Sequence, residues 1–186
     1  MKDLPLLAKD EADPEFRERW DKIGYDLAIF HVWAHDPMSF KAYTGFNGTV
    51  WAETDDGFPL LLKEMAVVQA SVLSHSSYEW GNHGVTMIKR GGTQAQLDAL
   101  IAGNPEADVF DETEKLVLSF TTEVVLDAKP SEATLTAMCE IFTHKQIVQL
   151  VFAICAYMLN SRFANLGGCE IGDDEDFGTF FMGRKT

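Results

Sequence analysis

The chain has 186 residues, of which 46% are hydrophobic and 24% charged, and its formal net charge is -14. This length suits one globular domain with a full-sized core. Nucleic acids and anionic membrane surfaces attract clustered Lys and Arg, so the acidic balance argues against both as partners. The sequence shows no uninterrupted apolar run of the roughly 18 residues that cross a membrane, and its first residues lack the apolar core of a signal peptide. We therefore expect a soluble, cytoplasmic protein.

The three cysteines are scattered along the second half of the chain, at Cys139, Cys155 and Cys169. No pair has the Cys-x-x-Cys spacing of a redox or zinc motif. We expect core or near-surface thiols in a reducing compartment, with Cys155 buried in the apolar segment around it.

Residues 1–13 are expected to form a loose arm. Apolar residues at helical spacing then predict a helix from Pro14 to about Ala34, and Pro37 ends it and starts a second helix to about Trp51. A central, very apolar helix begins at Pro59 and is expected to end near Ser74.

The second half of the chain carries clear helix-start patterns. Ser76 is expected to cap a helix that ends near Lys89, before two glycines. Capping boxes predict helices that begin after Thr93, Asp111 and Thr143, and a Pro-Ser pair at 130–131 predicts another that ends near residue 142. No alternating strand pattern occurs. We expect an all-α, single-domain bundle of about seven or eight helices, with its core at 14–171 and a tail at 172–186 whose aromatic residues dock on a neighbouring subunit or on the chain itself.

The polar residues concentrate between 59 and 84, against an apolar background. Glu64 lies in an apolar helical run, and a buried carboxylate needs a partner such as His83, His75 or Tyr78. Glu79 and His83 are four residues apart and share a helix face. Because Ser76 and Glu79 also form a capping-box pattern, Glu79 is either a helix cap or a functional acid.

The order of several segments resembles the carboxymuconolactone decarboxylase superfamily, which includes alkylhydroperoxidase D. These segments are AHDP at 34–37, PLLLKE with Glu64, SSYEWGNH at 76–83, the two glycines at 91–92 and FDETEK at 110–115. The resemblance spans about residues 25–170. It implies an all-helical subunit in a homo-oligomer, with trimers or hexamers favoured over dimers, and a site near the subunit interface.

The peroxidase branch of this superfamily has a Glu, a Cys-x-x-Cys pair and then a His. Glu64 and His83 match the first and last of these residues, whereas Ser76 and Glu79 stand where the cysteines would be. Peroxide reduction needs a thiolate and a resolving thiol, so thiol peroxidase activity is not expected.

The resemblance instead implies a cofactor-independent lyase, a decarboxylase that acts on a small lactone or an aromatic-derived acid. We expect His83 to be the general acid/base, Glu64 to orient it, and Glu79 to be a second acid or base beside the apolar wall of Trp80. The same groups would serve a proton-transfer isomerase or a hydrolase. Five side chains are expected to bind the substrate, with Arg162 holding its carboxylate: Tyr78, Ser76, Trp80, His75 and Arg162.

Two other classes of function stay open. If one helix continues through residue 76, His75, Glu79 and His83 form a stripe at i, i+4 and i+8, which is a ligand set for zinc or non-haem iron. The chain could also be a non-catalytic oligomeric scaffold. The density of ionisable groups on an apolar helix argues against a scaffold, because burying them costs stability.

Overall fold

The computed structural model describes residues 3–173, and this part of the chain is entirely helical, as predicted. It contains nine helices, which lie in the order α1 Pro14–Ile23, α2 Ala28–Trp33, α3 Pro37–Val50, α4 Leu60–Leu73, α5 Ser77–Lys89, α6 Gln94–Ile101, α7 Glu112–Asp127, α8 Glu132–Ile141 and α9 His144–Gly167. The predicted tail from residue 172 lies almost entirely outside the described residues, and its aromatic side chains are not among them.

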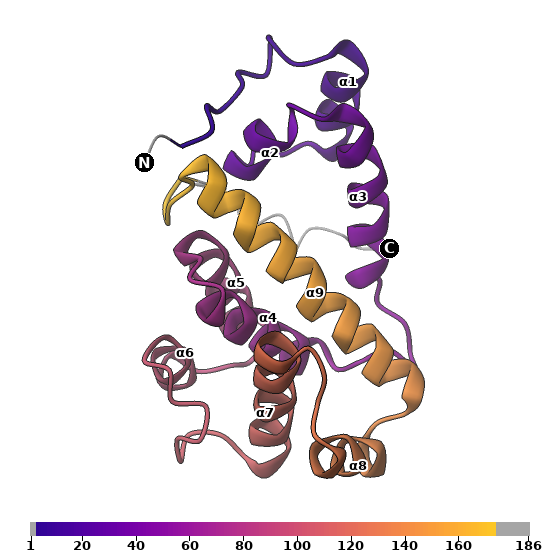
Figure 1. Cartoon of the computed structure of the whole chain (residues 1–186), viewed down its shortest axis with the longest axis vertical. Helices are drawn as coiled ribbons and strands as arrows, with labels where there is room; N and C mark the ends of the chain where they lie inside the picture. The colour runs from indigo at the N-terminus through magenta and orange to yellow at the C-terminus, as the bar shows by residue number, and fades with distance from the viewer. Residues whose placement is uncertain (1–2, 174–186) are drawn as a thin grey trace.

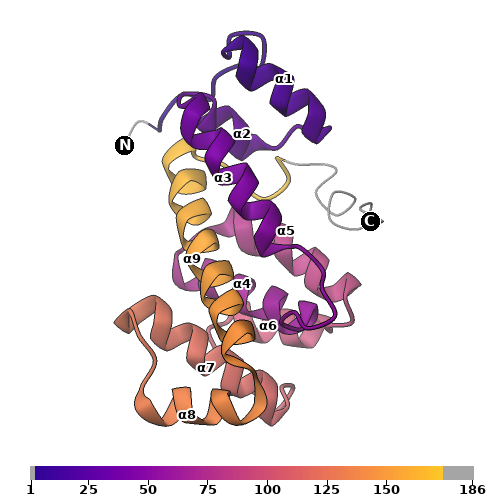
Figure 2. The same ribbon diagram turned by 90° about the vertical axis from the view of Figure 1, so that its right-hand side faces the viewer.

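The fold is built around α4 and α9 (Figure 1). α9 crosses the molecule obliquely and packs against α2, α4 and α7, while α4 also packs against α5 and α7. The helices α1, α2 and α3 form one end of the molecule, and α7 and α8 form the other (Figure 2). Residues on every side of α4 are fully buried, among them Met65, Val67 and Val68, which explains its continuous apolar sequence.

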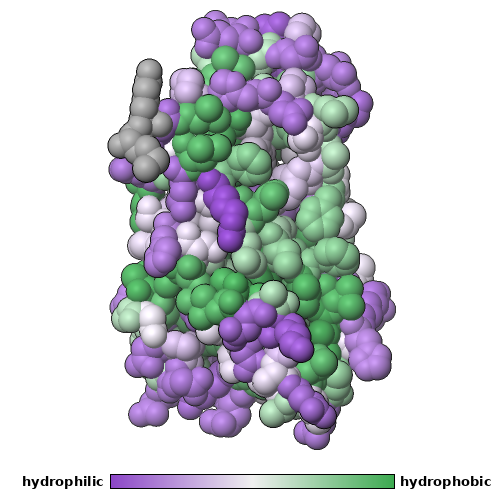
Figure 3. All heavy atoms as spheres, viewed as in Figure 1, coloured by the Kyte–Doolittle hydropathy of each residue, from purple (hydrophilic) through white to green (hydrophobic). Residues whose placement is uncertain are grey.

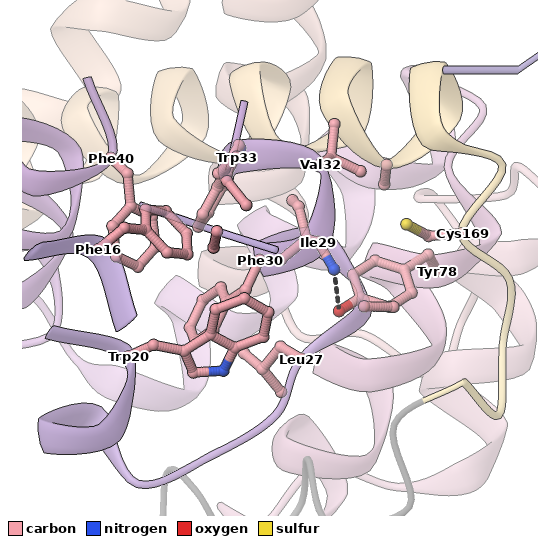
Figure 4. Close-up of a cluster of buried hydrophobic side chains, with 14 residues drawn as sticks. Phe16, Trp20, Leu27, Ile29, Phe30, Val32, Trp33, Phe40, Tyr78 and Cys169 are labelled. Atoms are coloured by element: carbon pink, nitrogen blue, oxygen red, sulfur yellow. Dashed lines mark hydrogen bonds between the residues drawn. The ribbon is translucent and has the colours of Figure 1, made fainter. Parts of the chain in front are cut away.

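The predicted helix from Pro14 to Ala34 is wrong, because the chain turns at Gly24. Gly24 has a φ of 82° and caps α1, with its N–H bonded to the carbonyl of Trp20. Glycine adopts this left-handed conformation at little cost. The apolar spacing continues across the turn, since Trp20 and Phe30 pack edge to face in one aromatic cluster (Figure 4). This cluster joins α1, α2 and α3.

The amino-terminal arm is docked rather than loose. The N–H of Leu4 donates to the carbonyl of Leu166 at the end of α9, and Leu7 is bonded to His31 in α2. Nδ1 of His31 lies 2.8 Å from the carbonyl of Leu7, and Nε2 of His35 lies 2.8 Å from that of Pro5. The arm therefore pairs with α2 and α9 through its backbone.

One helix in the described part of the chain, α9, is long and apolar enough to cross a membrane, which the inspection of the sequence did not anticipate. Half of its apolar window is buried within the fold, as expected of a core helix. Its outer face includes Cys155, so the prediction of a buried Cys155 is wrong. Cys139 is also exposed, whereas Cys169 is buried.

Candidate active site

The junction between α4 and α5 is a sharp turn. α4 ends at Leu73, His75 has a φ of 55°, and the hydroxyl of Ser76 accepts the N–H of Glu79 at 3.5 Å. The helix therefore does not continue through residue 76. His75 is exposed in the turn and does not share a helix face with Glu79 and His83, so the geometry behind the metal hypothesis is wrong. No group of three His, Cys, Asp or Glu suited to a metal occurs within residues 3–173.

The turn brings Glu64 of α4 and His83 of α5 together in the core. Nδ1 of His83 lies 2.8 Å from Oε2 of Glu64, and both residues are 0% exposed. The Nδ1–H donates to the carboxylate, so this hydrogen bond leaves the lone pair of the neutral imidazole on Nε2. The other oxygen of Glu64 accepts from Nε of Arg90 at 3.1 Å, and this cation offsets the buried negative charge.

Two aromatic rings fix the plane of the imidazole. The ring of Trp51, which follows α3, is stacked on His83 with a centroid distance of 5.5 Å and an interplanar angle of 19°. The ring of Tyr157 in α9 meets His83 edge to face at 4.3 Å. Nε1 of Trp51 donates to the hydroxyl of Tyr157 at 2.8 Å. The orientation of His83 is therefore determined by three helices besides its own.

Glu79 lies on the other side of His83 from Glu64. Its Oε2 is 4.0 Å from Nε2 of His83, and the residue is 2% exposed. Burial and then the negative charge of Glu79 raise the pKa of Tyr43 and of Tyr157 well above the usual value. The carboxylate of Glu79 thus faces the imidazole across 4.0 Å, which is the side on which a second acid or base would lie.

His83 and Glu79 open onto a cavity of about 350 Å³. One part of its wall is apolar and largely aromatic, and consists of Ile23, Leu27, Ile29, Phe30, Trp33, Trp51, Tyr78 and Tyr157. The polar part consists of Arg19, Thr44, Asn47, Glu53, Glu79, His83, Arg90 and Asn160. A site of this size and composition suits a small organic molecule with a flat apolar body.

The structure assembles some of the predicted site residues and not others. Tyr78 lines the cavity, and its hydroxyl accepts the N–H of Ile29 at 3.5 Å (Figure 4). Ser76 is buried as a helix cap, and Trp80 packs against the apolar cluster beneath α6. His75 and Arg162 are exposed and lie outside the cavity wall.

The sequence interpretation missed several residues of the cavity. Arg90 was detectable, because it follows His83 by seven residues, about two helical turns, and so lies on the same side of the chain. Asn160 was also visible as a polar residue in an apolar helix. No pattern pointed to Trp51, Tyr157 or Arg19, which come from distant parts of the chain.

The described part of the chain has the all-helical fold of the alkylhydroperoxidase AhpD core. The sequence matches no protein-family model and no curated protein. Among solved structures, an uncharacterised peroxidase-related protein from Ralstonia eutropha JMP134 with the alkylhydroperoxidase AhpD core superposes with a TM-score of 0.76. It is 23% identical, over 96% of this chain and 94% of that one.

Two further structures share this fold. A protein of unknown function from Agrobacterium tumefaciens, described as a candidate antioxidant-defence protein AhpD, has a TM-score of 0.66 and 18% identity over 74% of this chain and 93% of its own. The debrominase Bmp8, as a cysteine-to-alanine variant in complex with 2,3,4-tribromopyrrole, has a TM-score of 0.66 and 16% identity over 98% and 96%. At these identities the likeness concerns the fold.

Proposed function

We propose that the protein is a general acid/base enzyme, a carbon–carbon lyase of the carboxymuconolactone decarboxylase type that acts on a small lactone or aromatic-derived acid. One observation carries this proposal. A buried imidazole, bonded through Nδ1 to the carboxylate of Glu64 and held between two rings, opens onto a cavity of about 350 Å³. This arrangement orients Nε2 for proton transfer to a bound molecule.

In a decarboxylation, the bond between the substrate carbon and its carboxylate breaks and CO₂ leaves. The electron pair moves into the conjugated carbonyl and forms an enolate, which then takes a proton at carbon. His83, protonated on Nε2, donates this proton and recovers it from solvent. Glu64 stabilises the imidazolium, because its carboxylate accepts the Nδ1–H. Oε2 of Glu79 lies 4.0 Å from the same nitrogen. A substrate or a water molecule between the two atoms would let a proton pass from one to the other.

One of the structures with the same fold supports a small, flat substrate. Bmp8 binds a flat, halogenated five-membered ring, and the aromatic wall around Trp51 suits a flat ring as well. Within the described residues no cysteine lines the cavity, so its own side chains offer acid/base groups rather than thiols.

The test uses 4-carboxymuconolactone in deuterated water. CO₂ release is followed by a coupled assay, and deuterium in the product is followed by NMR. We expect both, and we expect His83→Ala to lower the rate by about 10²–10⁴. His144→Ala is the matched control, because His144 is exposed at the start of α9. Exchange without CO₂ release would identify a proton-transfer isomerase, and neither signal from this or related lactone acids would contradict the proposal.

A non-catalytic scaffold is the competing interpretation. In a scaffold, the cost of removing several charged groups from water would be offset by no catalytic benefit. These groups are all buried or nearly so: Glu64, Glu79, Lys63 and Arg90. Replacing a buried ionic network by apolar residues is often neutral or stabilising. Two results together would favour the scaffold. The parent would show no activity, and the double variant Glu64→Leu/His83→Leu would have the same free energy of unfolding as the parent.

A further inference from the structure

Arg19 places a positive charge in the cavity wall that no described carboxylate neutralises. Its Nε donates to Oγ1 of Thr44 at 2.6 Å, which fixes the guanidinium against α3. No Asp or Glu within residues 3–173 lies at ion-pair distance from it. By contrast, the lysines around α1 are all paired, in Lys9–Asp21, Lys22–Glu18 and Lys41–Glu15.

Arg19 differs from the other two described arginines that have no carboxylate at ion-pair distance. Arg17 and Arg162 each donate through Nη1 to a backbone carbonyl, and both lie outside the cavity wall. Arg19 instead bonds to a hydroxyl, which leaves its terminal nitrogens as donors. A guanidinium held through Nε presents the remaining N–H groups as a fork that matches a carboxylate.

A second polar feature lies in the wall of the same cavity. Oδ1 of Asn47 and Oδ1 of Asn160 are buried atoms in the cavity wall without a hydrogen-bond partner within residues 3–173. Asn160 is 5% exposed. A buried amide oxygen of this kind costs stability unless a ligand or water supplies a donor. The two amides therefore mark a place in the cavity wall for a hydroxyl or another polar group of a ligand.

The helix α3 sets the distance between the two ends. Thr44 holds Arg19, and Trp51, seven residues further on, is stacked on His83. Seven residues span about 10 Å along a helix axis. A molecule that reaches both ends is therefore elongated, with an anionic group at one end and its reacting carbon near the other.

We propose that Arg19, oriented by Thr44, binds the carboxylate that the substrate retains through the reaction, and so selects substrates that carry a second acid group away from the reacting carbon. The substrate class is then an organic acid with a flat apolar body, a retained carboxylate and a polar group in between. That the bound carboxylate stays on the product rests on the proposed function. The binding of an anion by Arg19 does not depend on it. It gives Arg19 the role that the sequence interpretation assigned to Arg162, whose guanidinium bonds to the carbonyl of Met158 outside the cavity.

The anion site is tested by calorimetric titration with trans-cinnamate and its uncharged analogue cinnamamide. The parent protein is expected to bind cinnamate about 10- to 100-fold more tightly, which is the worth of one charge-assisted hydrogen-bonded pair. Arg19→Gln should remove this preference, and Arg19→Lys should restore part of it, because Lys keeps the charge but not the fork. Arg162→Gln is the matched control and should bind like the parent.

Three results would overturn the anion site. These are equal binding of the two probes by the parent, an unchanged preference in folded Arg19→Gln, and no binding of either probe at millimolar concentration. The two proposals fail separately, because cinnamate binding needs no turnover. Loss of the Arg19 effect leaves the chemistry of His83 intact, and an inactive protein leaves the binding result standing.

Discussion

The imidazole of His83 is held by the Glu64 carboxylate and by the rings of Trp51 and Tyr157. We expect Glu64→Gln to lower kcat, because the amide can turn its NH₂ group toward Nδ1 and so favour the wrong tautomer. The double variant with His83→Ala should be no slower than His83→Ala alone, since residues that act as one unit are not additive. Turnover and melting temperature are measured together for each variant.

The melting temperatures separate catalysis from structure. If Glu64 and His83 only fill the core, each single variant leaves a buried partner unpaired, which costs about 1–3 kcal/mol of stability. Folded variants with the parent's activity would contradict the catalytic role.

Tyr43 is a second residue whose environment has a measurable consequence. Burial and the charge of Glu79 raise its pKa well above the usual value near 10. Below pH 10 the hydroxyl is protonated in both states, and its contribution to stability is fully present. Above that pH the unfolded chain ionises while the folded one does not, so the free energy of unfolding falls as pH rises.

We expect Tyr43→Phe to flatten this alkaline decline. Urea unfolding of both proteins at several pH values above about 10 measures how fast the free energy of unfolding falls with pH. The pKa of Lys63 is lowered by burial and acts in the opposite direction, but it is common to both proteins and cancels in the comparison. Parallel curves for parent and variant would refute the assignment.

Among the elements, the break between α1 and α2 depends on Gly24. A Cβ at this position meets no atom within 4 Å, so the cost of Gly24→Ala comes only from its φ of 82°. We expect a loss of about 1–2 kcal/mol. Gly45→Ala is the control, since Gly45 is also open but lies inside α3, where Ala should stabilise by about 0.5–1 kcal/mol. Calorimetry should show melting temperatures shifted in opposite directions, and equal shifts would contradict this reading.

The helices also show which structural features can be predicted from the sequence. The capping boxes at Thr93, Asp111 and Thr143 are all present, because each depends on residues only three positions apart. The turn at Gly24 was missed since the apolar spacing continues across it. The residues alone left the partner of Glu64 open between His83, His75 and Tyr78. The resemblance favoured His83, because it carries long-range information that helical periodicity lacks.

The cavity could not be predicted in the same way. Trp51 and Tyr157 meet over His83 from opposite halves of the chain, and no local pattern relates them. Arg19 enters the wall because α1 turns back at Gly24, so missing the turn also meant missing the residue.

At the scale of the whole molecule, α9 leaves an apolar stripe uncovered. Figure 3 shows apolar atoms across the face where Figure 1 places this helix. The stripe follows spacings of four and three residues, the repeat by which two helices pack side by side. Its exposed apolar members are Val148, Phe152, Cys155, Leu159 and Leu166, and the charged Arg162 interrupts it at one position of the repeat.

We therefore expect the chain to self-associate through α9, with a second copy as the occupant. Light scattering should show a dimer, trimer or hexamer, and Phe152→Asp should reduce it to the 20.7 kDa monomer. Leu126→Asp, at a position 62% exposed on α7, is the control and should not. Each chain carries a charge of -14, so association should tighten from about 20 to 200 mM salt as repulsion is screened. A parent protein that is monomeric at micromolar concentration would contradict this prediction.

The position of α9 also bears on the order in which the protein can fold during its synthesis. α4, the most buried helix, is covered in part by α9, and the arm at residue 4 pairs with the backbone of residue 166. Tyr157 and Asn160 complete the cavity wall from the same helix. A nascent chain that has not yet released α9 from the ribosome therefore exposes the apolar face of α4 to solvent or to a chaperone. The core and the cavity are therefore expected to close together, in one late step, when α9 emerges.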